Sequence, residues 1–121
     1  MSLNFIEADR FTIVRSEWSR GKGKDTCILN EMGERDCLGF FLKACGATDA
    51  QLLRLDEPID VIIKYGWESK LVEGCGEVLF QTVICRAIIS VNDNPILKDQ
   101  ERERQLISLF RQMNVNLNFI D

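Results

Sequence analysis

The sequence predicts a single α+β domain, mainly helical, with four to five helices and a small sheet of two to three short strands. The chain has 121 residues, a length that suits one globular domain over 1–121. Several segments space their apolar residues as helices do, and capping residues or glycines mark most of their ends. The last segment, 115–120, instead alternates apolar and polar residues, which is typical of a strand with one buried face.

The N-terminal segment 7–20 is predicted to be the first helix. Phe11, Val14 and Trp18 recur at helical spacing and form one apolar stripe. Gly21 then acts as a stop signal. The alternative is a strand from Phe11 to Val14, because the three residues that end it are β-branched.

A compact strand–turn–helix unit follows. We expect a flexible turn at 21–25, a short strand at 26–29, a turn at 30–33 and a helix over 37–45 that Asp36 caps and Gly46 ends. Gly39 lies inside this helix and costs it about 1 kcal/mol relative to alanine. That cost suggests either a close helix crossing at Gly39 or a helix that starts later than residue 37.

The middle of the chain is predicted to hold two short helices and a loop. Thr48 is placed to cap a helix over 49–54. The sequence Asp56-Glu57-Pro58 resembles the first turn of a helix over 59–65, although the β-branched residues there leave a strand open. The glycines of 66–76 indicate a loop.

The C-terminal part is predicted to contain two long helices. Segment 77–91 is apolar nearly all round, which is typical of a central buried helix, and Arg86 is its one cation. Asn92 and Asp93 are expected to build the turn that Pro95 completes. A second helix over 100–113 is capped by Asp99.

The exposed side of that last helix and the final strand carry two further expectations. The helix is predicted to keep Arg102, Arg104 and Arg111 on its solvent side. The tetrapeptide Leu-Asn-Phe-Ile occurs at both 3–6 and 117–120, so the two chain ends are predicted to pair as neighbouring strands.

Composition excludes several kinds of chemistry. The chain has no histidine and a formal charge of -4. The missing histidine removes Ser-His-Asp and Cys-His nucleophiles and every histidine-containing metal site. The acidic balance makes nucleic acid an unexpected partner, because binding depends on neutralising phosphates. No cofactor is indicated.

The N-terminus lacks a basic start and an apolar core, and no apolar run approaches the length of a membrane span. The five cysteines are an odd number and include no Cys-x-x-Cys pair. We therefore expect a cytoplasmic protein, no membrane association, and free, mostly buried thiols rather than a metal site.

Six residues are weak candidates for a binding site: Arg20, Lys22, Lys24, Cys37, Asn92 and Asp93. Cys37 lies in the first turn of a predicted helix, where the helix dipole lowers a thiol pKa, whereas packing in the core is the plainer interpretation. The Gly-Lys-Gly-Lys run at 21–24 has backbone groups that could hold a phosphate, but it is not a P-loop. A solvated turn with Trp18 in the core is the alternative.

Four short motifs occur along the chain: W-x-x-G-x-G from Trp18, a short apolar segment ending at Leu29, the string Gly33-x-x-x-Cys37-Leu38-Gly39, and a late apolar helix ending in Asn92-Asp93. Together they resemble the motifs of a group of small uncharacterised proteins from phages and other mobile elements of bacteria. Many members show Cys-Cys-Leu-Gly in that string, and this chain has Asp36 in the place of the first cysteine. The resemblance implies a mobile-element context and no activity.

Two functions from different classes follow. The first is a non-enzymatic accessory factor that binds a protein or itself, as a homodimer, because a well-formed domain lacks catalytic residues. The second is a small enzyme or ligand binder centred on Cys37, the 20–25 loop and Asn92-Asp93. A third interpretation, nucleic-acid binding through Arg15, Arg20, Lys22 and Lys24 with Trp18, predicts a steep salt dependence.

Overall fold

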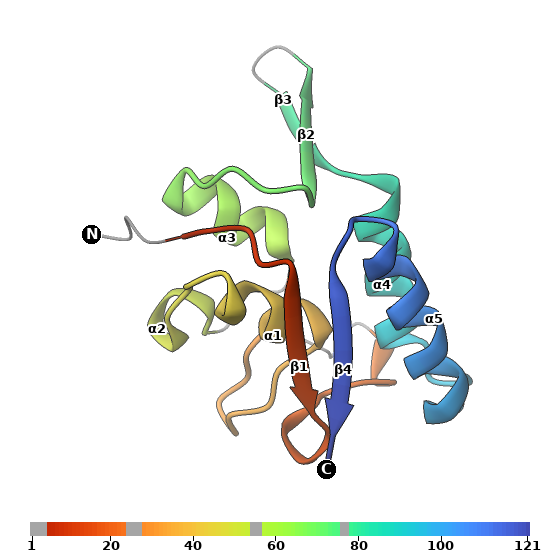
Figure 1. Ribbon diagram of the computed structural model, residues 1–121. Helices are drawn as coiled ribbons and strands as arrows, with labels where there is room; N and C mark the ends of the chain where they lie inside the picture. The colour runs from red at the N-terminus through yellow and green to blue at the C-terminus, as the bar shows by residue number, and fades with distance from the viewer. Residues whose placement is uncertain (1–4, 24–27, 54–56, 76–77) are drawn as a thin grey trace.

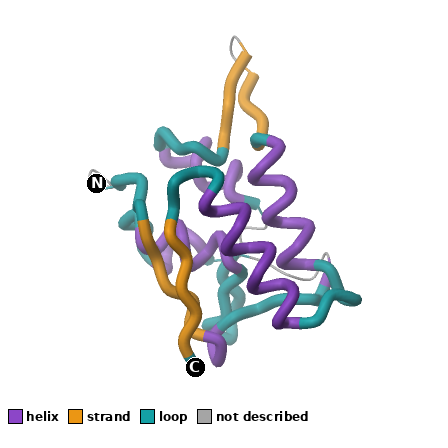
Figure 2. Tube along the Cα trace, turned by 45° about the vertical axis from the view of Figure 1, so that its right-hand side comes forward, coloured by secondary structure: helices purple, strands orange, loops and turns teal. Residues whose placement is uncertain are grey.

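The computed structural model describes residues 5–23, 28–53, 57–75 and 78–121, and it confirms a mainly helical α+β fold. Figures 1 and 2 show a pair of central strands with helices beside them and a separate hairpin at one end. The elements in chain order are β1 (Arg10–Val14), the 3₁₀ turn η1 (Arg15–Glu17), α1 (Cys37–Ala44), α2 (Asp49–Leu52), α3 (Pro58–Tyr65), β2 (Val72–Cys75), β3 (Val78–Gln81), α4 (Val83–Asp93), α5 (Asp99–Arg111) and β4 (Asn116–Ile120).

The first prediction to fail is the helix over 7–20, because this segment forms β1 followed by η1. Phe11 and Ile13 are buried while Thr12 is exposed, the period of two that defines a strand with one buried face. The alternative strand from Phe11 to Val14 was the correct interpretation. Trp18 lies in the core, as the solvated-turn interpretation expected.

The two chain ends do meet, but not through the repeated tetrapeptide. β1 and β4 pair in parallel, with Phe11 opposite Leu117 and Ile13 opposite Phe119. The strand predicted at 115–120 is therefore confirmed. Its partner is β1 rather than segment 3–6, whose first two residues lie outside the described part of the chain.

Helices cover one face of the β1–β4 pair, with α1 against β1 and α5 against β4 (Figure 1). Three rings meet between them: Phe11 packs edge-on against Phe41 at 5.4 Å and Phe110 at 4.8 Å, and Phe41 lies 5.6 Å from Phe110. Each such pair stabilises by about 0.5–1.5 kcal/mol beyond its burial. This cluster joins the N-terminal strand to helices from both halves of the chain.

The predicted strand–turn–helix unit is confirmed at its helix. The Asp36 carboxylate accepts a hydrogen bond of 2.7 Å from the Gly39 backbone N–H and caps α1. A Cβ at Gly39 would lie 2.1 Å from the Ile28 carbonyl oxygen, so only glycine fits there. The close approach involves the backbone of a preceding segment rather than a second helix.

The middle of the chain is partly as predicted. Thr48 caps α2 through a capping box, and the helix is shorter than the predicted 49–54. Segment 58–65 is the helix α3, which Gly66 ends in the left-handed region at φ 67°, so the strand alternative is wrong. The predicted loop 66–76 contains β2.

The predicted helix over 77–91 is two elements, β3 and then α4. β3 pairs with β2 in an antiparallel hairpin, and α4 buries only Cys85, Ile88 and Asn92 while Arg86 is exposed. The helix is therefore not the central one. The apolar run suggested one buried helix because its first part is a strand, in which apolar residues lie on both faces.

The last helix begins one residue earlier than predicted and ends at Arg111. Asp99 is its first residue and Lys98 is the N-cap. Arg102, which was expected on the solvent side, is buried. Among the described residues no helix is both long and apolar enough to cross a membrane.

Candidate functional site

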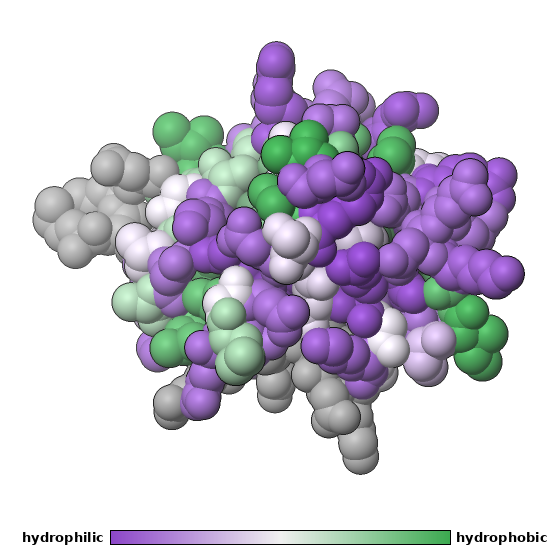
Figure 3. Space-filling view, turned by 90° about the horizontal axis from the view of Figure 1, so that it is seen from below, coloured by the Kyte–Doolittle hydropathy of each residue, from purple (hydrophilic) through white to green (hydrophobic). Residues whose placement is uncertain are grey.

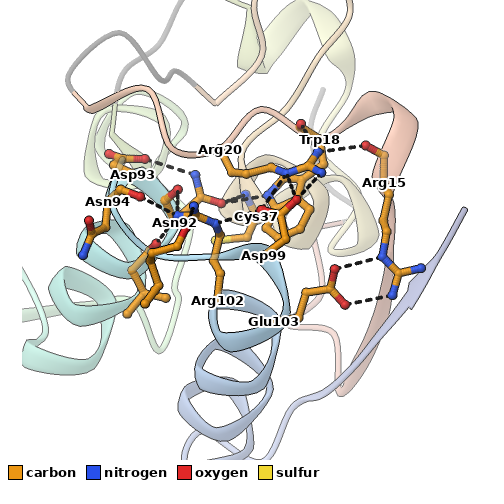
Figure 4. Close-up of polar contacts among 12 residues, drawn as sticks. Arg15, Trp18, Arg20, Cys37, Asn92, Asp93, Asn94, Asp99, Arg102 and Glu103 are labelled. Carbon is orange, nitrogen blue, oxygen red and sulfur yellow. Dashed lines mark hydrogen bonds and ion pairs between the residues drawn. The ribbon is translucent and has the colours of Figure 1, made fainter.

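The side chain of Asn92 joins three distant segments at the end of α4 (Figure 4). Its Oδ1 accepts hydrogen bonds from Trp18 Nε1 at 2.9 Å and from the Cys37 backbone N–H at 3.1 Å. Its Nδ2 donates to the Ser19 carbonyl oxygen at 3.1 Å and to Asp93 Oδ1 at 3.0 Å. Asn92 is fully buried, and its amide uses all four of its ordinary bonding positions. Asn92 was expected to build a turn, and it is instead an interior crosslink.

Arg102 reinforces this junction from α5. Its guanidinium donates to four backbone carbonyls and to one carboxylate: Val91, Asn92, Asn94, Leu97 and Asp99. The side chain is almost entirely buried. A cation at the C-terminal end of α4 complements both the unpaired carbonyls and the negative end of the helix dipole.

Arg20 covers the outer side of Trp18. The guanidinium carbon lies 4.4 Å from the centre of the Trp18 ring, and Nη2 contacts Asp99 Oδ2 at 2.7 Å. Arg20 also donates to the Trp18 carbonyl oxygen at 2.9 Å. The hydrogen bond and the charge of Arg20 lower the pKa of Asp99. The guanidinium is therefore already occupied by partners within the chain.

The backbone of Gly21 completes the junction. Its N–H donates to the Asn92 carbonyl oxygen at 2.8 Å. Its φ of 70° is in the left-handed region, and a Cβ there would lie 3.2 Å from Arg102 Nη2. We call the set Trp18, Arg20, Gly21, Cys37, Asn92, Asp93 and Arg102 the Asn92 junction.

Cys37 lies in the Asn92 junction with its thiol fully buried. Burial raises its pKa well above the ordinary value, and the charges of Asp36 and Asp93 raise it further. The expected lowering by the helix dipole is therefore wrong, because loss of water outweighs the dipole. A reactive thiolate at Cys37 does not fit this environment. Cys45 and Cys85 are buried core residues, as expected.

Asp36 is the titratable group that the sequence identified only as a cap. Burial raises the pKa of its carboxyl to about 7, the Gly39 N–H bond opposes this, and the charge of Asp93 adds to it. The carboxylate is engaged with the backbone of α1. Its environment therefore points to a structural role that depends on pH.

The basic residues of the proposed nucleic-acid patch that the structure describes, Arg15, Arg20 and Lys22, are paired with acids. Arg15 contacts Glu103 at 2.8 Å and Asp121 at 2.9 Å, and Lys22 Nζ lies 3.6 Å from Glu34. Lys22 stands apart from the Asn92 junction, and Lys24 lies outside the described residues. The patch therefore offers little unbalanced positive charge to a phosphate.

A shallow hollow of about 780 Å³ lies between the N-terminal segment and the loop after α3. Trp67 lies in a stack between Phe5 at 4.2 Å and Tyr65 at 5.1 Å. Lys64 lies 5.6 Å from the Tyr65 ring centre. The two faces of the Trp67 ring are therefore engaged by rings of the chain itself.

The clearest exposed apolar surface lies at the other end of α4, where the β2–β3 hairpin extends away from the body (Figures 1 and 2). The exposed fractions are 45% for Leu79, 43% for Phe80, 69% for Val83 and 56% for Ile63. Consecutive strand residues point to opposite faces, so both faces of β3 are open at Leu79 and Phe80. We call these four residues the hairpin surface.

Ile63 belongs to this surface because α3 lies beside β3. The Ile59 backbone N–H donates to Gln81 Oε1 at 3.2 Å, so the first turn of α3 lies against the end of β3. By contrast, the end of the molecule opposite the hairpin shows hydrophobic groups scattered among hydrophilic side chains (Figure 3). The sequence missed the hairpin surface because it read β3 as part of a buried helix.

Comparison with family models, with curated proteins and with solved structures finds no match to this chain. The mobile-element resemblance therefore rests on the motifs alone. Trp18, Gly21, Cys37 and Asn92, which carry much of that resemblance, meet at one buried junction.

Proposed function

We propose that the protein is a non-enzymatic accessory factor that acts by binding a protein through the hairpin surface. The observation that carries this proposal is the exposure of Leu79 and Phe80 on opposite faces of one strand. A two-stranded hairpin is only marginally stable in water unless a hydrophobic face is covered. A partner that covered both side chains would supply the missing apolar contact, at about 25 cal/mol for each Å² removed from water.

The enzyme alternative has less support. Its centre would be Cys37, the 20–25 loop and Asn92-Asp93, but Cys37 and Asn92 are buried while Lys22 of the loop is exposed. Cys37 has a buried thiol with a raised pKa. The amide of Asn92 and the guanidinium of Arg20 are occupied by partners from the chain itself. The geometry favours a scaffold at this position.

The biological context and the cellular location of the proposed factor are inferred mainly from the sequence. A bacterial mobile element is the context that the resemblance implies, and it stays part of the proposal. A cytoplasmic location is supported by three free, buried cysteines in the described part of the chain: Cys37, Cys45 and Cys85. Paired basic residues support a protein rather than a nucleic acid as the partner.

The test compares two double variants, each of which replaces two exposed apolar side chains by serine. Leu79→Ser with Val83→Ser alters the hairpin surface, and Met32→Ser with Ile96→Ser alters two side chains that are at least as exposed elsewhere. Each tagged protein is crosslinked in a bacterial lysate, and the captured proteins are identified by mass spectrometry. We expect the wild type and the control to capture the same protein and the hairpin variant to lose it. Equal capture by both variants, or a strict monomer that captures nothing, would contradict the proposal.

A further inference from the structure

The free edge of β3 differs from that of β2. β2 and β3 pair only with each other in the described residues, so each keeps one open edge. β3 reads Val-Leu-Phe-Gln, without charge, glycine or proline, whereas β2 contains Glu73 and Gly74. Natural edge strands usually carry charges, proline or bulges that prevent pairing with another chain. β3 lacks these protections and has strong β propensity.

The register of the hairpin shows which backbone groups face the open edge. Glu73 pairs with Phe80 and Gly74 with Leu79. At the base of the hairpin, Leu71 lies opposite Thr82. This pair is hydrogen-bonded, because the Thr82 N–H donates to the Leu71 carbonyl oxygen at 3.0 Å. Bonded and non-bonded pairs alternate in an antiparallel ladder.

The backbone N–H and C=O groups of Thr82 and Phe80 therefore point toward β2. The backbone N–H and C=O groups of Leu79 and Gln81 point away from β2, so the open edge of β3 carries two donors and two acceptors. This spacing is complementary to itself when a second strand runs antiparallel. Leu79 of each copy then faces Gln81 of the other, and both pairs exchange two hydrogen bonds.

We propose that a second copy of this chain pairs antiparallel with β3, so that the two hairpins form a four-stranded sheet. Phe80 lies on the two-fold axis opposite Phe80 of the other copy, in a non-hydrogen-bonded pair where side chains approach most closely. α3 contacts β3 near Gln81, and the rest of the hairpin extends away from the body (Figures 1 and 2). Val78–Gln81 carry no charge, and no like charges meet along this pairing. This inference rests on the proposed function and names its partner.

The experiment uses opposite charges at the axis. Phe80→Lys places two ammonium groups against each other, and Phe80→Glu places two carboxylates. We expect each variant alone to raise the dissociation constant of the dimer at least about tenfold, and an equimolar mixture to recover the dimer. Sedimentation velocity from micromolar to near-millimolar protein measures this, with circular dichroism as the check on folding.

Two further variants keep the test independent of folding. Leu79→Pro removes one outward N–H and leaves the bonds to β2 intact, so it too weakens the dimer. Ile96→Lys changes an exposed side chain at the far end of α4 and leaves the dimer unchanged.

Each outcome separates this inference from the proposed function. A chain that is monomeric throughout, yet captures a protein through the hairpin surface, overturns the dimer and keeps the function. A dimer that survives both Phe80 variants, or variants that fail to recover it when mixed, also overturns the pairing. A monomer that captures nothing overturns both.

Discussion

The Asn92 junction and the β2–β3 hairpin lie at opposite ends of α4. The junction buries polar groups, whereas the hairpin exposes apolar ones. At the junction, polar groups are buried and the amide of Asn92 is fully bonded to the chain. At the hairpin, Leu79 and Phe80 are half exposed, and one backbone edge of β3 pairs with no strand in the part of the chain that the structure describes. The polar groups of the junction already have partners within the chain, which fits a structural role. The hairpin has exposed apolar side chains and a free strand edge, which fits binding to a partner.

This comparison reverses the weight of the sequence motifs. Trp18, Cys37 and Asn92 carry the recognisable pattern, yet their polar groups form hydrogen bonds to one another inside the fold. The hairpin carries no recognisable motif. A substitution at the junction should therefore change stability, whereas a substitution at the hairpin should change association.

The largest effect is expected from Asn92→Ala. It leaves the Trp18 indole N–H, the Cys37 N–H and the Ser19 carbonyl buried without their partner. Each such group costs about 1–3 kcal/mol, so we expect the free energy of unfolding to fall by about 4 kcal/mol. Urea denaturation measures this. Asn118→Ala on the exposed side of β4 is the matched control and should change it by less than about 0.5 kcal/mol. Equal losses would mean that the junction is not a special crosslink.

Gly39→Ala is expected to follow. The new Cβ would lie 2.1 Å from the Ile28 carbonyl oxygen and 3.0 Å from Arg35 Cβ, and a backbone atom cannot move aside cheaply. We expect a loss of about 3 kcal/mol in the free energy of unfolding. Ser108→Ala on the exposed side of α5 should leave stability unchanged or slightly higher. A neutral Gly39→Ala would show that segment 28–29 packs less closely on α1 than described.

Two helix caps and one glycine show where sequence reasoning succeeds. Asp36 and Thr48 were placed correctly as helix caps, because a cap depends on residues within one turn of itself. Gly39 was correctly expected at a close approach, although its neighbour was misassigned. Local signals of this kind decide where helices begin and end.

The failures concern contacts made far along the chain. β1 is a strand because β4 pairs with it across the whole sequence, and local spacing at Phe11 and Trp18 favoured a helix. Arg102 occupies a position that helical spacing assigned to solvent, yet the carbonyls at the end of α4 draw it inside. A pattern within one helix does not reveal an acceptor on another.

Asp36, which precedes Cys37 of the Asn92 junction, is expected to make stability depend on pH. The pKa of Asp36 is about 7 in the folded chain and near the ordinary aspartate value of 3.8 in the unfolded chain. Between these values the folded state binds more protons, so stability falls as pH rises from about 4 to about 7 and is flat above that range. We expect Asp36 to contribute a fall of about 2 kcal/mol, discounted from the full shift.

Asp36→Asn provides the matched control. An amide oxygen can still accept from the Gly39 N–H, so the cap is kept while the titration is removed. Urea denaturation across this range should give a smaller slope for the variant, and the variant should be the more stable protein above pH 7. Identical pH profiles for the two proteins would contradict the raised pKa.

The smallest effect on stability is expected at the hairpin. Phe80→Ala removes a ring that is 43% exposed and lies outside the core cluster. The free energy of unfolding of the monomer should fall by less than about 1 kcal/mol, whereas Phe41→Ala in the core should cost about 3–5 kcal/mol. Both are measured by urea denaturation at concentrations low enough that association adds nothing. At high protein concentration, the Phe80→Ala variant should also dimerise less than the wild type, because Phe80 lies in the proposed dimer contact and Phe41 does not. A ring that mattered equally to folding would belong to the body of the domain, and the hairpin would then be a packed element rather than an open edge.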